Sequence, residues 1–219
     1  MHIFHQQFIF QRTAPRQVQR CWCWLLFGWL ALVALTCASC FPAGNSVTSQ
    51  RPRPTVPPFS QPTHISIPSL GLDAAILPVG TDRYGAMEAP GAGHPASDPI
   101  WSSTFWWKLG AKPGQPGNAV LAGHVDRIDG GYGPFWNLGL IQPGDQITIT
   151  EQDGQVYTFQ VTQASAFPVA DGGPNDPLIQ RVFGPATTAN LNLITCYGDW
   201  IGTEFNKRLV VFSTLVSNK

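Results

Sequence analysis

The sequence predicts an all-β domain, and three observations carry that prediction. Short runs of Val, Ile, Leu, Thr and Phe recur from residue 64 onward and are separated by Gly, Pro, Asp and Asn. Strong helix formers are sparse between these separators, and the chain contains 22 Gly and 20 Pro. A length of 219 residues suits one domain with appendages, or at most two small domains.

The zero formal net charge conceals an uneven distribution of charge along the chain. Residues 1–63 carry five arginines and no acidic residue, so all 13 acidic residues lie in 64–219. Eight basic residues oppose them there, which leaves a formal charge of about −5 on this part. Binding to a phosphate backbone needs clustered Lys and Arg, so this charge excludes a nucleic-acid-binding domain.

The N-terminal residues predict a membrane anchor. Residues 1–20 form a mildly basic cytoplasmic leader, and residues 21–40 are uncharged and apolar. Twenty helical residues rise about 30 Å, the thickness of a bilayer core. Because arginines flank only the N-terminal side, we expect an uncleaved transmembrane signal anchor with the rest of the chain outside the cell membrane. The alternative is a cleaved lipoprotein signal with lipidation at Cys40, although Cys37 stands where such signals usually have Leu.

A linker follows the apolar segment. Residues 41–63 hold six prolines among Ser, Thr, Gln and Gly, a composition typical of an extended, semi-rigid spacer. The globular domain is therefore predicted to span 64–219.

The pattern within 64–219 predicts seven strands and few helices. Residues 91–117 and 164–189 are predicted as loops, the first with one helical turn, and a short helix is expected near 135–140. The turn Asp153-Gly154 predicts a hairpin between two of the strands. The predicted strands are 64–68, 74–79, 118–123, 146–151, 155–163, 191–196 and 207–215.

Three polar residues stand at ends of predicted strands. Cys196, the only cysteine beyond the N-terminal segment, ends one strand, and Arg208 opens the next. An antiparallel hairpin of these strands would place the thiol beside the guanidinium. His124 also ends an apolar strand, so the three side chains can converge at one rim of a barrel.

These residue types suit nucleophilic acyl transfer. A nearby cation favours the thiolate of Cys196, the nucleophilic form. His124 can protonate a leaving amine, and Arg208 can donate hydrogen bonds to the oxyanion of a tetrahedral intermediate. Alone, each has a structural interpretation, as a buried apolar Cys, a satisfied His or a surface Arg. Export weakens that interpretation for Cys196, because an unused exposed thiol outside the cell is oxidised.

The segments around these residues resemble the sortase family of cysteine transpeptidases. Ala119-Val120-Leu121-Ala122-Gly123-His124, Leu193-Ile194-Thr195-Cys196 and Arg208-Leu209-Val210-Val211 are similar to three signature segments of sortases, in the family's order and at about its spacings. The resemblance covers roughly 62–216, and it looks closest to class E and F sortases.

The resemblance implies a fold, a reaction and a set of site residues. It implies a closed eight-stranded β-barrel with short helices, and cleavage of a C-terminal sorting signal such as Leu-Pro-x-Thr-Gly or Leu-Ala-x-Thr-Gly after Thr. The acyl group then passes to an amine of the cell wall or of a surface protein. His124, Cys196 and Arg208 match the catalytic positions, and Thr195 matches a substrate-orienting position. No cofactor or metal is expected.

Several alternatives stay open at this level. The segment Asp126–Gly130 could be a calcium loop or a solvated loop, and Asp126 could orient His124. Trp101, Trp106 and Trp107 could line a groove or fill the core. As whole-chain alternatives we retain an exported transpeptidase acting on peptidoglycan stem peptides and a non-enzymatic, membrane-anchored β-barrel binding module.

Overall fold

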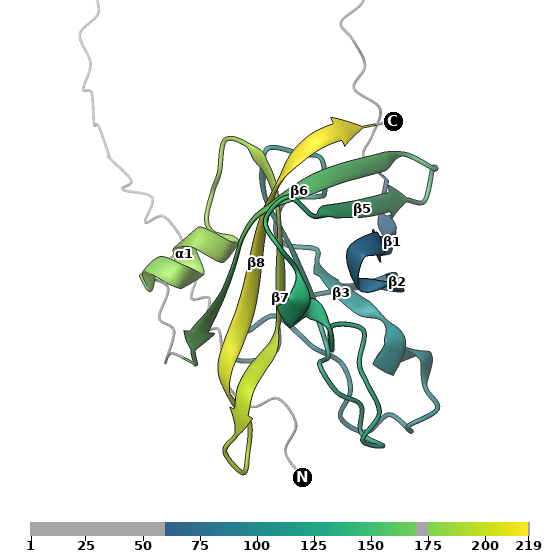
Figure 1. Ribbon diagram of the computed structural model, residues 1–219, viewed down its shortest axis with the longest axis vertical. Coiled ribbons are helices and arrows are strands. Elements are labelled where there is room, and N and C mark those ends of the chain that lie inside the picture. The colour runs from purple at the N-terminus through teal and green to yellow at the C-terminus, as the bar shows by residue number, and fades with distance from the viewer. Residues whose placement is uncertain (1–59, 170–174, 219) are drawn as a thin grey trace, which may run out of the picture. The chain divides into compact units, whose positions relative to one another are not determined.

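The computed structural model describes residues 60–169 and 175–218, which form a closed eight-stranded β-barrel (Figure 1). The predicted all-β barrel is therefore confirmed. The strands follow one another around the barrel in the order β1-β2-β3-β4-β7-β8-β6-β5, and β5 closes it by pairing with β1. Their bounds are β1 Pro62–Ile67, β2 Leu72–Val79, β3 Thr104–Trp107, β4 Gly117–Gly123, β5 Gln146–Glu151, β6 Val156–Pro168, β7 Ala189–Trp200 and β8 Phe205–Asn218.

The predicted leader and membrane segment lie outside the described residues, as does most of the predicted linker. Within 60–169 and 175–218, no helix has the length and apolar character that crossing a bilayer requires. The first strand, β1, begins at Pro62, two residues inside the predicted linker.

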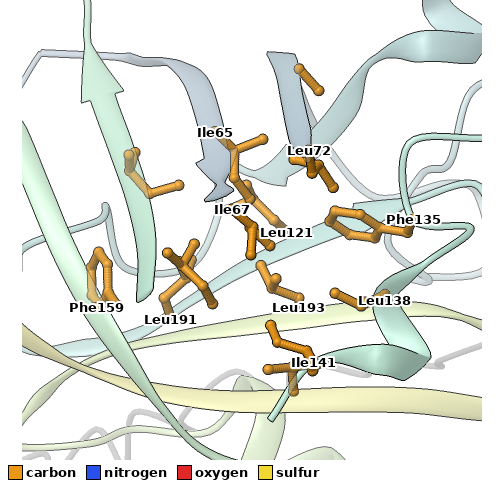
Figure 2. Packing of buried hydrophobic residues seen from close by; sticks show 14 of the residues in the cluster. Ile65, Ile67, Leu72, Leu121, Phe135, Leu138, Ile141, Phe159, Leu191 and Leu193 are labelled. Atoms are coloured by element: carbon orange, nitrogen blue, oxygen red, sulfur yellow. The ribbon is translucent and has the colours of Figure 1, made fainter. Parts of the chain in front are cut away.

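The barrel interior is filled by the inward-facing residues of alternating strands. Side chains of a β-strand point alternately to opposite faces, so every second residue reaches the core. Ile65 and Ile67 of β1 meet Leu121 and Leu193 there, and all four are fully buried (Figure 2). This packing explains the alternating pattern of β1 and β5.

The strands β4, β7 and β8 are buried on both faces, because a helix covers them from outside. α1 (Pro177–Phe183) lies outside the barrel wall (Figure 1), and its Ile179 and Val182 pack on Val120, Ile194 and Val210. Strands covered on both sides need continuous apolar runs, and Ala119–Gly123 is such a run.

Two elements were missed by the sequence interpretation. The strand β3, inside the predicted 91–117 loop, has only four residues, all buried, so it shows no alternation. The helix α1 lies inside the predicted 164–189 loop, although Asp176 caps it by accepting from the N–H groups of Leu178 and Ile179 and Pro177 occupies its first turn. The remaining short helices are 3-10 turns, η1 (Pro68–Leu70), η2 (Pro99–Ser102) and η3 (Leu138–Leu140). The last lies within the helix expected near 135–140.

Buried asparagines attach α1 to the barrel. Asn192 Nδ2 donates to Val182 O at 2.8 Å, and Asn118 Nδ2 donates to Arg181 O at 3.1 Å and to Gly184 O at 2.9 Å. These bonds satisfy carbonyls at the end of a seven-residue helix that propensity alone would not stabilise.

We predict that Asn192→Ala lowers the free energy of unfolding by about 1–3 kcal/mol, because it leaves the Val182 carbonyl buried without this donor. Urea denaturation monitored by tryptophan fluorescence measures the change. The exposed Asn175, just before α1, provides the control, and Asn175→Ala should change the free energy by less than about 0.5 kcal/mol. Equal effects of the two substitutions would contradict the role given to Asn192.

Candidate functional site

The β7–β8 hairpin places the thiol opposite the guanidinium. Cys196 and Arg208 are directly paired in the antiparallel register, between the pairs Thr195–Leu209 and Tyr197–Lys207. Side chains of directly opposed residues lie on the same face of a sheet. The placement predicted from the sequence is thus confirmed.

The parallel pairing of β4 with β7 brings His124 to the same rim. The last pair in the register is Ala122 with Ile194, and two residues farther along each strand stand His124 and Cys196. Thr195 Oγ1 donates to Gly123 O at 2.8 Å and so joins the two strand ends. Thr195 is buried, so its observed contact is this strand-joining bond.

His124 is enclosed by the segment between β2 and β3. Its side chain is 2% exposed, and its Nε2 lies 2.8 Å from Pro90 O. Trp101 and Phe105 flank the ring, with ring centroids 5.1 and 5.4 Å from that of His124. Burial lowers the pKa of His124, while the Pro90 carbonyl and the charge of Asp126 raise it more weakly. A backbone carbonyl is therefore an orienting acceptor for His124, and Asp126 acts on the ring through its charge.

Burial is also the largest influence on the pKa of the Cys196 thiol. Cys196 is partly buried, and this burial raises its pKa above the ordinary value, with smaller upward contributions from Asp126 and Glu204. Arg208 lowers the pKa of Cys196, as expected, but burial outweighs it. Burial therefore opposes the thiolate that the neighbouring cation favours. With the pKa of His124 lowered and that of Cys196 raised, the site rests at neutral pH as a neutral thiol and a neutral imidazole.

Arg208 is held by main-chain carbonyls and one carboxylate. Its Nη1 donates to Phe205 O at 2.9 Å and to Lys207 O at 3.0 Å, and its Nη2 forms a 3.0 Å ion pair with Glu204 Oε2. Asp199, near the end of β7, donates its main-chain N–H to Asn206 Oδ1 and accepts from Asn206 Nδ2 through its carboxylate. The carboxylate of Glu204, which raises the pKa of the thiol, is therefore paired with Arg208.

A small cavity of about 60 Å³ opens beside Cys196 and Arg208. Its other walls are apolar and include Phe183 of α1 and Met87 of the β2–β3 segment, together with Ala86, Ala89 and Ile194. The sequence interpretation missed the contribution of residues 80–91. Asp82 Oδ1 accepts from the N–H groups of Tyr84 and Ala86 and so shapes a turn in this segment.

The candidate calcium loop and the tryptophan groove find no support. The carboxylate of Asp129 forms an ion pair with Arg127, with Nη2 and Oδ2 3.0 Å apart, and accepts a hydrogen bond from the N–H of Gly131. In the described part of the chain, no group of three or more His, Cys, Asp or Glu side chains is placed to hold a metal ion.

Trp101, Trp106 and Trp107 are buried, so they belong to the core.

Comparison with known proteins gives a family match and a shared fold. Residues 65–216 match the Sortase domain family. Solved structures with the same fold include Streptococcus agalactiae sortase C1 in complex with MTSET, at a TM-score of 0.51 and 19% identity over 72% of this chain and 70% of that one. A lid mutant of Corynebacterium diphtheriae sortase A gives a TM-score of 0.51 and 21% identity, covering 75% and 74% of the two chains. Sortase A of Listeria monocytogenes gives a TM-score of 0.50 and 21% identity, covering 74% of this chain and 90% of that one. Comparison with curated proteins produced no match.

We predict that Glu204→Gln makes Cys196 more reactive, because the charge of Glu204 raises the pKa of the thiol. The rate of alkylation by iodoacetamide at pH 7 should rise about threefold, because a lower pKa of Cys196 increases its thiolate fraction. Asp199→Asn in the same loop should leave the rate unchanged. A slower reaction in Glu204→Gln would show that its pairing with Arg208 matters more than its charge.

We predict that Gly91→Ala displaces His124, because a Cβ at residue 91 would lie 2.9 Å from Trp101 Cη2 and 3.2 Å from His124 Nε2. Loss of the bond to Pro90 should lower the pKa of His124 further, as followed by NMR titration of its imidazole. Turnover should fall about tenfold or more. Gly80→Ala is the control, since its Cβ would approach no atom closer than 3.4 Å. An unchanged His124 titration in Gly91→Ala would contradict the positioning by Pro90.

Proposed function

The chain belongs to the sortase family of cysteine transpeptidases, which act on surface proteins, and from this premise we propose how it works. The proposed substrate is a secreted protein with a C-terminal sorting signal of the Leu-Pro-x-Thr-Gly or Leu-Ala-x-Thr-Gly type. The enzyme cleaves the bond after Thr and transfers the acyl group to an amine at the cell surface. The observation that carries the proposal is the convergence of Cys196, Arg208 and His124 at one rim.

The first half of the reaction forms a thioester. Cys196 Sγ attacks the carbonyl carbon of the signal's Thr while its proton passes to His124, so the neutral resting pair supplies both the nucleophile and the acid. Arg208 stabilises the negative oxygen of the tetrahedral intermediate. The C–N bond then breaks, and His124 gives its proton to the leaving amine. The products of this half are an acyl-thioester on Cys196, a free amine and a neutral imidazole.

The second half transfers the acyl group. An incoming primary amine attacks the thioester carbonyl and gives one proton to His124. The C–S bond breaks, and the proton returns from His124 to the sulfur of Cys196. Water in place of the amine gives hydrolysis by the same steps.

Recognition of the signal is proposed to use the cavity beside the thiol. Met87, Phe183 and Ile194 give it an apolar wall, which suits an apolar side chain of the signal better than a charged one. The buried Thr195 helps to orient the peptide by holding the ends of β4 and β7 together.

The proposed location is the outer face of the cell membrane. This proposal rests on the uncharged residues 21–40 and on the arginines that precede them. A single-pass anchor and a proline-rich linker would then present the catalytic domain to exported substrates.

We predict that the chain cleaves a fluorescent Leu-Pro-x-Thr-Gly peptide and joins it to an added primary amine. Cys196→Ala should abolish both products, and His124→Ala should do nearly the same. Arg208→Ala should reduce kcat about 10²- to 10³-fold, the cost of losing one oxyanion donor. Mass spectrometry of the products and of the trapped thioester provides the measurement.

The non-enzymatic alternative makes a different prediction for the thiol. If the domain is only a binding module, native Cys196 should resist alkylation until the protein unfolds. Full activity of Cys196→Ala would overturn the proposed function.

A further inference from the structure

A second cavity lies at the same end of the barrel as the thiol. It has a volume of about 290 Å³ and is formed by the β1–β2 turn and by the segment from Tyr132 to Leu138. The register places it there, because Ile76 of β2 pairs with Thr104 of β3, and Thr104 pairs with Gly123 of β4. The beginning of β2, which lines the cavity, is therefore at the end of the barrel where β4 delivers His124.

The segment that lines this cavity is attached to the main chain of His124. Phe135 N donates to His124 O at 3.0 Å, and Gly133 N donates to Val125 O at 3.0 Å. Asp126 and Tyr132 face each other in an isolated antiparallel bridge. Asp126 also acts electrostatically on both His124 and Cys196. Tyr132 is thus directly paired with a residue whose charge reaches the reacting groups.

Two aromatic side chains stand exposed on a rigid base. Tyr132 is 69% exposed and Trp136 is 46% exposed, and their rings stack with centroids 4.3 Å apart. Phe135 and Leu138 of the same segment are fully buried and point into the core beside Leu72 and Leu193 (Figure 2). Because these anchors hold the segment, the exposed pair presents a preformed aromatic surface to solvent.

The charge around this aromatic surface favours a cation. Asp73 lines the same cavity, as do the polar residues Ser102 and Asn137. The side chain of Asp73 is 70% exposed, and its Oδ1 is hydrogen-bonded to His64 Nε2 at 2.5 Å, which leaves Oδ2 toward solvent as a second acceptor. The domain as a whole carries an excess of acidic residues. Trp and Tyr faces attract ammonium groups within about 6 Å, and a neighbouring carboxylate adds to that attraction. These features together suit a primary ammonium on a short aliphatic or peptide chain.

We propose that this cavity binds the amine acceptor of the transfer reaction, with its ammonium group against Tyr132 and Trp136. The inference rests on the proposed function and adds a place for the second substrate. Held there, the acceptor loses one proton to solvent, and its neutral amine then reaches the thioester on Cys196. The second proton passes to His124 as the C–N bond forms and the C–S bond breaks. The chemical class is a primary amine of a peptide or amino-acid side chain.

The experiment separates transfer to amine from transfer to water. In the full chain, Trp136→Ala and Tyr132→Ala should each raise KM for Nα-acetyl-lysine amide roughly three- to tenfold. Hydrolysis of the sorting peptide should stay within about twofold, because water needs no acceptor site. Trp136→Phe and Tyr132→Phe, which keep an aromatic face, should restore most of the affinity. Leu140→Ala is the matched control, since Leu140 is 67% exposed on the neighbouring η3 but does not line the cavity.

A non-reactive cation tests the recognition itself. Nα-acetyl-Nε-trimethyl-lysine amide keeps the positive charge and cannot be acylated at that nitrogen. It should inhibit aminolysis without slowing hydrolysis, and it should shift the NMR signal of the Trp136 indole N–H. The neutral Nε-acetyl analogue should do neither.

Other results would overturn the inference. If the alanine variants lower aminolysis and hydrolysis together, or neither, the cavity is not an acceptor site. A failure of the proposed function looks different, because the unsubstituted chain then hydrolyses no sorting peptide. The shift of the Trp136 signal by the trimethylated cation still decides in that case whether the cavity binds ammonium.

Discussion

The parallel pairing of β4 with β7 is the constraint on which the site depends. It runs from Gly117 and Ala189 to Ala122 and Ile194, and the 2.8 Å bond from Thr195 to the Gly123 carbonyl extends it to the end of both strands. A parallel pair is buried on both faces in most proteins, and here the barrel core covers one face while α1 covers the other. The need to cover the outer face of this pair accounts for α1 and for the buried asparagines that bind it. Phe183 of the same helix forms part of the apolar wall of the thiol cavity.

Burial also decides the electrostatics of the site. The same packing that fixes His124 and Cys196 removes them from water, so the charged form of each is disfavoured. Both shifts favour the neutral thiol and the neutral imidazole. The guanidinium of Arg208 lies beside the thiol, and an ion pair with Glu204 and hydrogen bonds to two carbonyls hold it in place.

Loops form part of the walls of the candidate site, on a rigid barrel that sets where they begin and end. The β2–β3 segment contributes Met87 to the thiol cavity and the Pro90 carbonyl to His124, so one loop contacts the surroundings of both residues. The segment after β4 serves the other substrate in our proposal, because it carries Tyr132 and Trp136 on the anchors Phe135 and Leu138. In that proposal the peptide binds against the apolar lining beside Cys196, and the amine binds in the cavity lined by aromatic and acidic side chains.

The amino-acid sequence alone predicted an all-β domain, because short apolar runs separated by Gly, Pro, Asp and Asn are typical of strands. The closed eight-stranded barrel was implied by the resemblance to sortases, and the strand pairing confirms it. The sequence also determined that Cys196 and Arg208 would face each other, since a hairpin leaves little freedom for residues at its two strand ends. Only the tertiary structure revealed β3 and α1, which are too short to show a period. The Pro90 carbonyl, the neutral state of the thiol and the stacked Tyr132 and Trp136 were likewise decided in three dimensions. Each depends on desolvation or on contacts between side chains and segments that meet only in the folded protein. The pattern of neighbouring residues does not predict such contacts.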